Sequence, residues 1–186
     1  MVIKFSQEML TILGYARDEA MRTGSYGIGA DHIVLGLLRH RDNNACRALA
    51  ACGIEAQALK EAVDAKVFAD RAVPWEERVR VRPTRAAAAL LGVAAYEMLK
   101  YGPPEILSSH LLLALMRSEK GAAVDFLRQA GLDYDQIYAL MRDHHFVLPR
   151  QERQAPLPKV EDLLGPLGEQ LTNLFGSVQA KTNFYS

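Results

Sequence analysis

The amino-acid sequence predicts an all-α protein made of two pseudo-symmetric four-helix repeats, which together form one domain of eight helices. A C-terminal linker with a short amphipathic helix follows. Residues 6–68 align with residues 84–146 without a gap at an offset of 78, and 14 of the 63 pairs are identical. Apolar residues recur at helical spacing in both segments. Helix-capping residues stand at matching positions, so a duplicated helical unit accounts for all three observations.

The first helix of each repeat is predicted from its cap, its apolar stripe and its closing glycine. Ser6 and Thr84 each precede a helical stripe of apolar residues, and their hydroxyls suit an N-cap because they accept hydrogen bonds from first-turn N–H groups. Gly24 and Gly102 follow the stripes, where glycine adopts the left-handed conformation at little cost. The predicted ranges are about 6–23 and about 84–101.

The second helix of each repeat, expected at about 30–39 and 108–117, is apolar almost all round and should be the buried centre of its unit. Length alone would also allow a strand. A helix is favoured because the segments lack the β-branched enrichment of strands, and because leucines recur around a shared histidine and arginine.

Two further helices complete each repeat. In the first repeat we expect about 44–51, closed by Gly53, and about 55–66. In the second repeat we expect about 121–130 and about 133–145, the latter opening on Asp133, where the helix dipole favours an acidic group.

A connector and a tail lie outside the repeats. Residues 69–83 are a connector that Trp75 could order. Prolines at 149, 156, 158 and 166 predict an extended linker after the domain, which we place at 1–148. Within 149–186, four apolar residues at helical spacing form a face that docks either on the domain or on another chain. These residues are Leu167, Leu171, Leu174 and Phe175.

Composition argues against several classes of function. The 22 basic and 22 acidic residues balance, which signals neither nucleic acid nor an anionic membrane as a partner. The longest apolar runs are far shorter than the roughly 20 residues that cross a bilayer, and charges interrupt the N-terminal segment, so we expect a cytoplasmic protein. Cys46 and Cys52 are too few for a disulfide framework and are expected to be reduced structural thiols.

The segment from Gly29 to Arg39 resembles the G-T-E-H-L-L-L-G-L-L-R signature of the Clp N-terminal repeat family, and the segment from Leu107 to Arg117 echoes it. The resemblance covers about 140 residues and includes the capped first helix and the Leu-x-x-x-Gly close of the third. Residues 160–172 resemble, more weakly, the linker that precedes the first ATPase module in these chaperones. The phosphate-binding loop G-x-x-x-x-G-K-[S/T] of that module is missing, since the sequence contains no Gly-Lys pair.

The resemblance implies a non-enzymatic protein-binding module that binds a Clp-type AAA+ ATPase, its adaptors or its client proteins as an accessory or regulator. Met1 and the ending Asn183 to Ser186 favour such a stand-alone form. One alternative is the substrate- and adaptor-receiving N-terminal domain of a full-length Clp ATPase. Another is a small-ligand or enzymatic protein on the same scaffold, which would require a polar pocket.

The resemblance also implies candidate ligand residues. Some family members bind phosphoarginine through the acidic residue of the signature and the threonine that opens the first helix. The matching residues are Asp31 with Ser6, and Ser109 with Thr84. The first pair keeps a carboxylate that can accept a guanidinium, whereas the second has lost it. The alternative, which this loss favours, is that Asp31 and Ser109 cap the starts of helices.

Neither a metal site nor a catalytic site is predicted. His32 and His110 lie in separate repeats without the further ligands that zinc needs, so we expect them to be buried and to hydrogen-bond the inter-helix loops. The nucleophile motif G-x-S-x-G is absent, and we expect no cofactor. For protein binding, the candidates are Trp75 in the connector, as an aromatic anchor, and Leu171, Leu174 and Phe175 in the tail.

Overall fold

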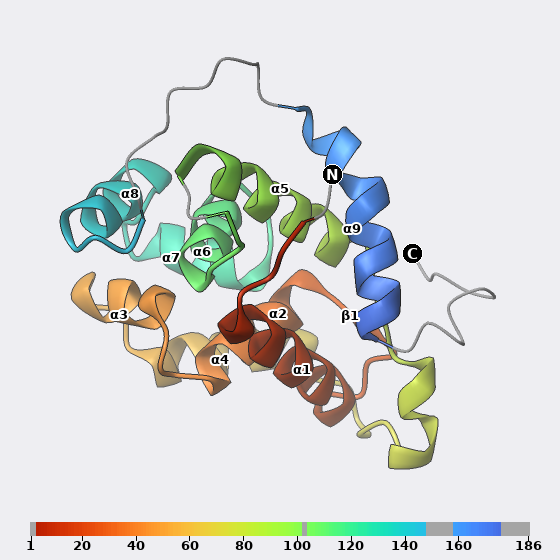
Figure 1. Ribbon diagram of the computed structural model, residues 1–186. Helices are drawn as coiled ribbons and strands as arrows, with labels where there is room; N and C mark the ends of the chain where they lie inside the picture. Colours follow the sequence, from red (N-terminus) through yellow and green to blue (C-terminus); the bar gives the residue numbers. More distant parts are fainter. Residues whose placement is uncertain (1–2, 102–103, 148–157, 176–186) are drawn as a thin grey trace.

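The computed structural model describes residues 3–101, 104–147 and 158–175. The chain is mainly helical, and its helices follow the order of two repeats, a tail helix and short connections (Figure 1). The first repeat contains α1 (Gln7–Arg22), α2 (Ala30–Arg39), α3 (Asn44–Ala51) and α4 (Ala56–Val67). The second contains α5 (Arg85–Tyr101), α6 (Ser108–Met116), α7 (Ala122–Gln129) and α8 (Tyr134–Asp143), and α9 (Val160–Leu174) follows. The predicted all-α, two-repeat fold is confirmed.

The helix ends form where the sequence places their caps. The Ser6 hydroxyl accepts a hydrogen bond from the Met9 N–H at 3.1 Å, and Asp133 caps α8 by accepting from the Gln136 N–H at 2.8 Å. The left-handed glycines predicted after α1, α3 and α7 are Gly24, Gly53 and Gly131, with φ of 85°, 79° and 86°. Gly102, predicted to close α5, lies outside the described residues.

Short backbone pairings cross between the repeats and make the pseudo-symmetry visible. β1 (Gly27–Ile28) pairs in parallel with β2 (Arg82–Pro83), and an isolated bridge joins Phe5 to Ile106. At the offset of 78, Ile28 aligns with Ile106 and Phe5 with Pro83, so the two pairings are equivalent contacts. In each case, the segment that precedes the first helix of one repeat lies beside the segment that precedes the second helix of the other.

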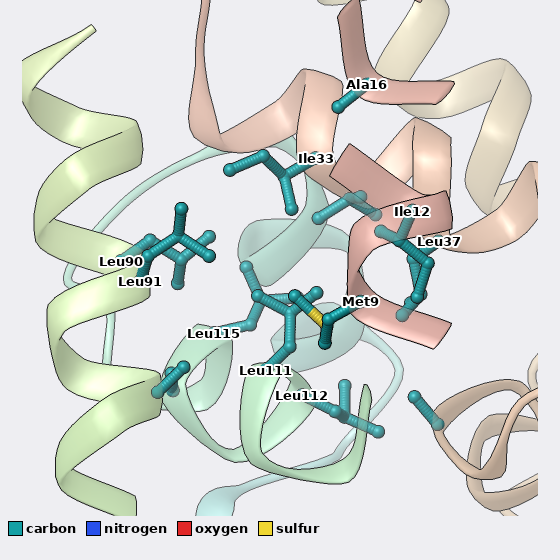
Figure 2. Close-up of a cluster of buried hydrophobic side chains, with 14 of the residues drawn as sticks. Met9, Ile12, Ala16, Ile33, Leu37, Leu90, Leu91, Leu111, Leu112 and Leu115 are labelled. Carbon is teal, nitrogen blue, oxygen red and sulfur yellow. The ribbon is translucent and has the colours of Figure 1, made fainter. Parts of the chain in front are cut away.

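One apolar core joins the two repeats. Figure 2 shows side chains of α1 and α2 facing those of α5 and α6 in a single cluster. The labelled members are Met9, Ile12, Ala16, Ile33, Leu37, Leu90, Leu91, Leu111, Leu112 and Leu115, all at most 4% exposed. Neither half therefore encloses its apolar surface alone. α2 approaches α1 closely at Gly36, where a Cβ would lie 2.5 Å from the Ile12 carbonyl oxygen.

The connector is held by its backbone and its valines. The Ala69 and Val73 N–H groups donate to carbonyls at the end of α1 at 2.8 Å, and Val73 and Val81 are buried. Between them, η1 (Trp75–Arg80) forms a 3₁₀ turn. Trp75 is 62% exposed, and among the described residues its ring stacks on Arg78 alone, so the expectation that Trp75 orders the connector is wrong.

The tail helix α9 packs back onto the domain along α5 (Figure 1). Its buried residues recur every four positions: Leu163, Leu167, Leu171 and Phe175. Polar contacts secure the C-terminal part of this helix: the Ile3 N–H donates to the Gln170 amide oxygen at 3.1 Å, and buried Arg82 donates to the Phe175 carbonyl at 2.8 Å. The tail was expected to dock either on the domain or on another chain, and in the structure it docks on the domain.

Pro166 lies inside α9, so the prediction that it marks extended linker is wrong. A proline in a helix interior costs about 3 kcal/mol, because it removes one hydrogen bond and crowds the preceding turn. Burial of one complete apolar face against α5 offsets this cost. The domain boundary at residue 148 remains a prediction, since residues 148–157 lie outside the described ranges.

Candidate functional site

The Asp31 carboxylate, a predicted ligand residue, caps a helix of the other repeat. It accepts hydrogen bonds from the Ala122 and Ala123 N–H groups at 3.2 and 3.3 Å, at the start of α7. Gly121 before them has φ 148° and no side chain that could do this. Asp31 therefore acts as a cap for α7 rather than for α2, the helix that contains it.

Ser6 and Thr84, the expected partners of the acidic positions, are occupied as N-caps of their own helices. Thr84 Oγ1 accepts from the Ala87 N–H at 3.1 Å, as Ser6 does in α1. Among the described residues, no hydrogen bond joins Ser6 to Asp31. In the first repeat, the Ser6 hydroxyl and both Asp31 carboxylate oxygens therefore already accept hydrogen bonds from helix-start N–H groups.

In the second repeat, Ser108 makes the capping contact that Asp31 makes in the first, whereas Ser109 occupies the position aligned with Asp31. Ser108 Oγ accepts from the Ala45 N–H at 3.3 Å, at the start of α3, which mirrors the contact of Asp31 with α7. The Ser108 N–H donates to Glu8 at 2.9 Å. Ser109, the position aligned with Asp31, is fully buried, and its hydroxyl has no hydrogen-bond partner among the described residues.

The two shared histidines serve helix starts. His32 Nδ1 accepts from the Gly29 N–H and His110 Nδ1 from the Leu107 N–H, both at 2.9 Å. This places the proton on Nε2, which in His32 lies 3.1 Å from Thr23 Oγ1. Burial lowers the pKa of His32, which favours the neutral ring. Buried, loop-bonded histidines are confirmed.

A buried carboxylate, an arginine and a tyrosine form one cluster in the second repeat. Glu97 is completely buried and accepts from the Tyr134 hydroxyl at 2.8 Å and from the Arg117 guanidinium. Arg117 also lies over the Tyr134 ring, 4.2 Å from its centroid. Burial, followed by the bond to Glu97, raises the pKa of the Tyr134 hydroxyl, which therefore stays protonated and donates.

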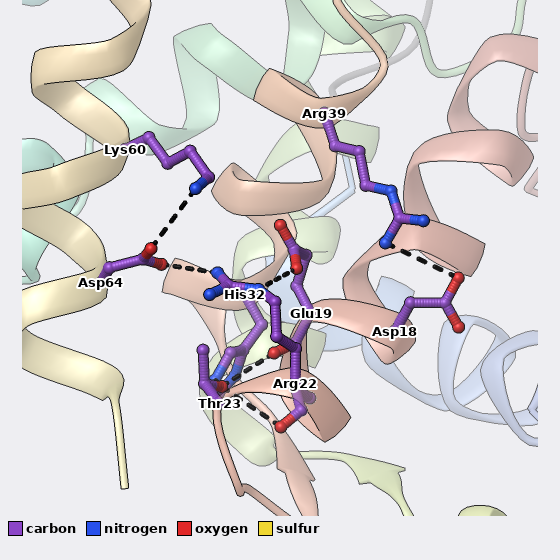
Figure 3. Close-up of polar contacts among 9 residues, drawn as sticks. Asp18, Glu19, Arg22, Thr23, His32, Arg39, Lys60 and Asp64 are labelled. Carbon is purple, nitrogen blue, oxygen red and sulfur yellow. Dashed lines mark hydrogen bonds and ion pairs between the residues drawn. The ribbon is translucent and has the colours of Figure 1, made fainter. Parts of the chain in front are cut away.

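The aligned carboxylate of the first repeat, Glu19, has different partners (Figure 3). Arg22 donates to Glu19 Oε2 at 2.6 Å and to Asp64 at 2.7 Å, and Lys60 pairs with Asp64 at 3.5 Å. Arg39, the counterpart of Arg117, points instead toward Asp18 at 3.9 Å.

A hollow lies beside this ion-pair cluster. Two adjoining concave regions of about 430 and 290 Å³ share Leu38, Arg41 and Lys60 as a common wall. The larger region extends to Ala56, and the smaller reaches Glu19. Sequence analysis did not single out this hollow. The signal that could have found it is the replacement of a tyrosine in one repeat by a small residue in the other.

The two cysteines are free thiols whose pKa is raised by burial. Burial raises the pKa of the Cys46 thiol, and the nearby Arg47 lowers it by less. Cys46 Sγ contacts the Leu37 carbonyl oxygen at 3.5 Å, and Cys52 is also a free thiol. Over the described ranges, no three metal-ligating side chains converge, and no helix is long and apolar enough to cross a membrane.

The predicted protein-binding residues fall into two groups. Trp75 and Leu174 are 62% and 38% exposed, so both are accessible on the surface. Leu171 and Phe175 are 0% and 4% exposed because they pack between α9 and the domain, and a partner could reach them only if α9 left.

The sequence model of the Clp repeat (R) N-terminal domain matches residues 4–130, which cover the first repeat and α5 to α7 of the second. The chain belongs to this family. Relatives of the Clp domain include a chaperone protein ClpB of Oceanobacillus iheyensis, 27% identical over 81% of this chain and 18% of its own length. Another is the negative regulator of genetic competence ClpC/MecB of Bacillus subtilis, 28% identical over 69% of this chain and 15% of its own. The chain spans less than a fifth of each.

Solved structures of Clp-type N-terminal domains share the fold. The N-terminal domain of Hsp104 from Candida albicans has a TM-score of 0.60 at 16% identity, and covers 81% of this chain and 97% of its own. The N-terminal domain of ClpD from Arabidopsis thaliana has a TM-score of 0.56 at 17% identity, with 76% and 97% covered. The fold is therefore that of a Clp N-terminal domain.

Proposed function

We propose that this Clp N-terminal domain is a non-catalytic protein-binding module that engages a Clp-type AAA+ unfoldase, an adaptor of that unfoldase or its client proteins. Family membership over residues 4–130 is the observation that carries the proposal. The polar interior supports the proposal. The two histidines that the repeats share, the Ser6 hydroxyl and Asp31 are all hydrogen-bonded to helix starts, so they serve the structure.

Asp31 also bears on the phosphoarginine hypothesis. A guanidinium ligand would have to compete with the two N–H groups of α7 for the carboxylate, and the aligned Ser109 offers no charge. We therefore propose recognition through the surface of the domain, with phosphoarginine binding at Asp31 and Ser6 as the less favoured form.

The test uses the tagged full chain and a purified Clp unfoldase from the same organism. We expect reversible binding in biolayer interferometry and a changed rate of ATP hydrolysis or of unfolding of a fluorescent client. A chain that binds neither the unfoldase, nor its adaptors, nor an unfolded client would refute the proposal. An arginine-phosphorylated client, offered beside its unphosphorylated form, separates phosphoarginine recognition from general client binding.

A second candidate function is that the same module acts within a full-length Clp ATPase. It is favoured by the share of the relatives that this chain matches, only 14–18% of their length. Sequencing the gene beyond the Ser186 codon separates the two, because a continuing reading frame with a G-x-x-x-x-G-K-[S/T] loop would establish the in-cis form.

A further inference from the structure

The hollow of the first repeat is the place where the second repeat inserts a tyrosine. At the offset of 78, Ala56 aligns with Tyr134, and Lys60 with Tyr138. In the second repeat, the Tyr134 ring lies against Arg117 and its hydroxyl donates to Glu97. In the first repeat, the methyl group of Ala56 cannot reach the aligned residues, and a hollow of about 430 Å³ remains.

The chemistry that receives Tyr134 is retained in the first repeat. Glu19 corresponds to Glu97 and lines the smaller, adjoining region of the hollow. Its Oε2 accepts from Arg22, whereas Oε1 makes no hydrogen bond within the described chain and is not sealed from solvent. A carboxylate oxygen therefore remains open to a donor. Leu38 supplies an apolar wall, and Arg39 lines the same region with its guanidinium over the Tyr15 ring, 4.6 Å from the centroid.

Of the four cations that line the hollow, three are paired with carboxylates and one, Arg41, is not paired within the described ranges. Arg22 and Lys60 are paired with Asp64, and Arg39 lies 3.9 Å from Asp18. Arg41 is exposed and has no ion pair in the part of the chain that the structure describes, although Glu55 also lines the larger region. Arg41 holds a left-handed φ of 40°, which is unusual for a residue other than glycine. Its counterpart is Glu119, so this unpaired cation belongs to the first repeat alone.

We propose that this hollow binds a tyrosine side chain from an acidic segment of a client or adaptor protein. The phenol ring enters beside Ala56 and Leu38, and its hydroxyl donates to Glu19 as Tyr134 donates to Glu97. Acidic residues next to the tyrosine pair with Arg41 at the rim. The hollow has the size range of ligand sites, about 300–1,000 Å³. The inference rests on the proposed protein-binding function and assigns it a site and a partner chemistry.

The probe is a fluorescein-labelled peptide with Glu-Asp-Tyr-Glu-Asp at its centre and Gly-Ser repeats on either side. Its affinity for the full chain is measured by fluorescence anisotropy at low salt, with a matched peptide in which alanine replaces the tyrosine. Ala56→Tyr places a tyrosine in the hollow at the position that aligns with Tyr134. Because Tyr134 is the first residue of α8, a tyrosine is compatible with the start of the aligned helix α4. Ala65→Tyr adds the same side chain to an exposed position of α4 and is the matched control.

We expect Ala56→Tyr to weaken peptide binding at least about tenfold and Ala65→Tyr to leave it unchanged. Arg41→Glu, which installs the charge of the second repeat, should weaken it about fivefold and reduce its salt dependence. Replacing the peptide's tyrosine by phenylalanine should weaken binding, because Glu19 then lacks a donor. Amide chemical shifts in titrated, ¹⁵N-labelled protein should change first around Leu38 and Lys60.

Equal binding by wild type, Ala56→Tyr and Arg41→Glu would overturn the inference, as would the absence of any peptide binding. In either case, retained binding of the purified unfoldase by the wild-type chain would leave the proposed function standing. Loss of unfoldase, adaptor and client binding in the wild type would instead refute the proposed function itself.

Discussion

Replacing Asp31 tests whether this carboxylate is a structural cap or a free ligand group. It accepts from two first-turn N–H groups of α7, at 3.2 and 3.3 Å, across the boundary between the repeats. Loss of a capping side chain costs about 0.5–2 kcal/mol, and loss of a negative charge at a helix N-terminus costs about 0.3–1 kcal/mol. Asp31→Ala should therefore lower the free energy of unfolding by about 1–3 kcal/mol.

For a domain of this size, 1 kcal/mol corresponds to about 2–4 °C in Tm, so the expected decrease is several degrees. The assay is thermal and urea unfolding followed by circular dichroism, with hydrogen exchange at Ala122 and Ala123. Asp18→Ala is the matched control, because Asp18 is partly exposed and lies 3.9 Å from Arg39, a distance typical of pairs that contribute little. Unchanged Tm and unchanged exchange at α7 in Asp31→Ala would refute the capping role and restore Asp31 as a candidate ligand.

Three further predictions concern single side chains. Burial lowers the pKa of His32 in the folded state, so the unfolded state binds more protons and the free energy of unfolding should fall as the pH decreases through about 6.5. His32→Asn should make the free energy of unfolding depend less on pH in urea titrations at about pH 5–8. Leu167→Ala should lower the free energy of unfolding by about 2–5 kcal/mol in urea unfolding, whereas Leu174→Ala, at an exposed position of the same helix, should lower it by less than about 1 kcal/mol. Equal decreases would contradict the docking of α9. Because burial raises the pKa of Cys46, its alkylation by iodoacetamide at neutral pH should be much slower in the folded chain than in urea, and equal rates would show that the thiol is not protected.

The sequence was sufficient for the fold because the signals are local and appear twice. Caps, apolar stripes and closing glycines each act within a few residues, and the second copy confirms the register of the first. The predicted start of α3 at residue 44 and the end of α2 at residue 39 agree with the structure. The tail was harder to predict, since Pro166 indicates a linker while the four-residue spacing of Leu163, Leu167 and Leu171 indicates a helix.

The candidate site depended on contacts between distant residues, which the sequence does not encode locally. Asp31 reaches α7 across 91 positions, and its place in the sequence indicates a helix cap but not which helix it caps. Likewise, the differing partners of Glu19 and Glu97 depend on which arginine turns inward in each repeat. The alignment of the repeats contains one signal for the hollow: Ala56 stands where the second repeat has Tyr134. A missing ring leaves a space that other side chains must fill or that stays open to solvent.

The crossed backbone pairings have a consequence for how the two halves diverged after duplication. Phe5 with Ile106 and Pro83 with Ile28 join the halves through main-chain groups, whose hydrogen bonds do not depend on the identity of the side chains. A proline and a phenylalanine can therefore occupy equivalent positions without separating the halves. These positions were therefore free to differ between the two copies, while the apolar core that the repeats share also holds the halves together.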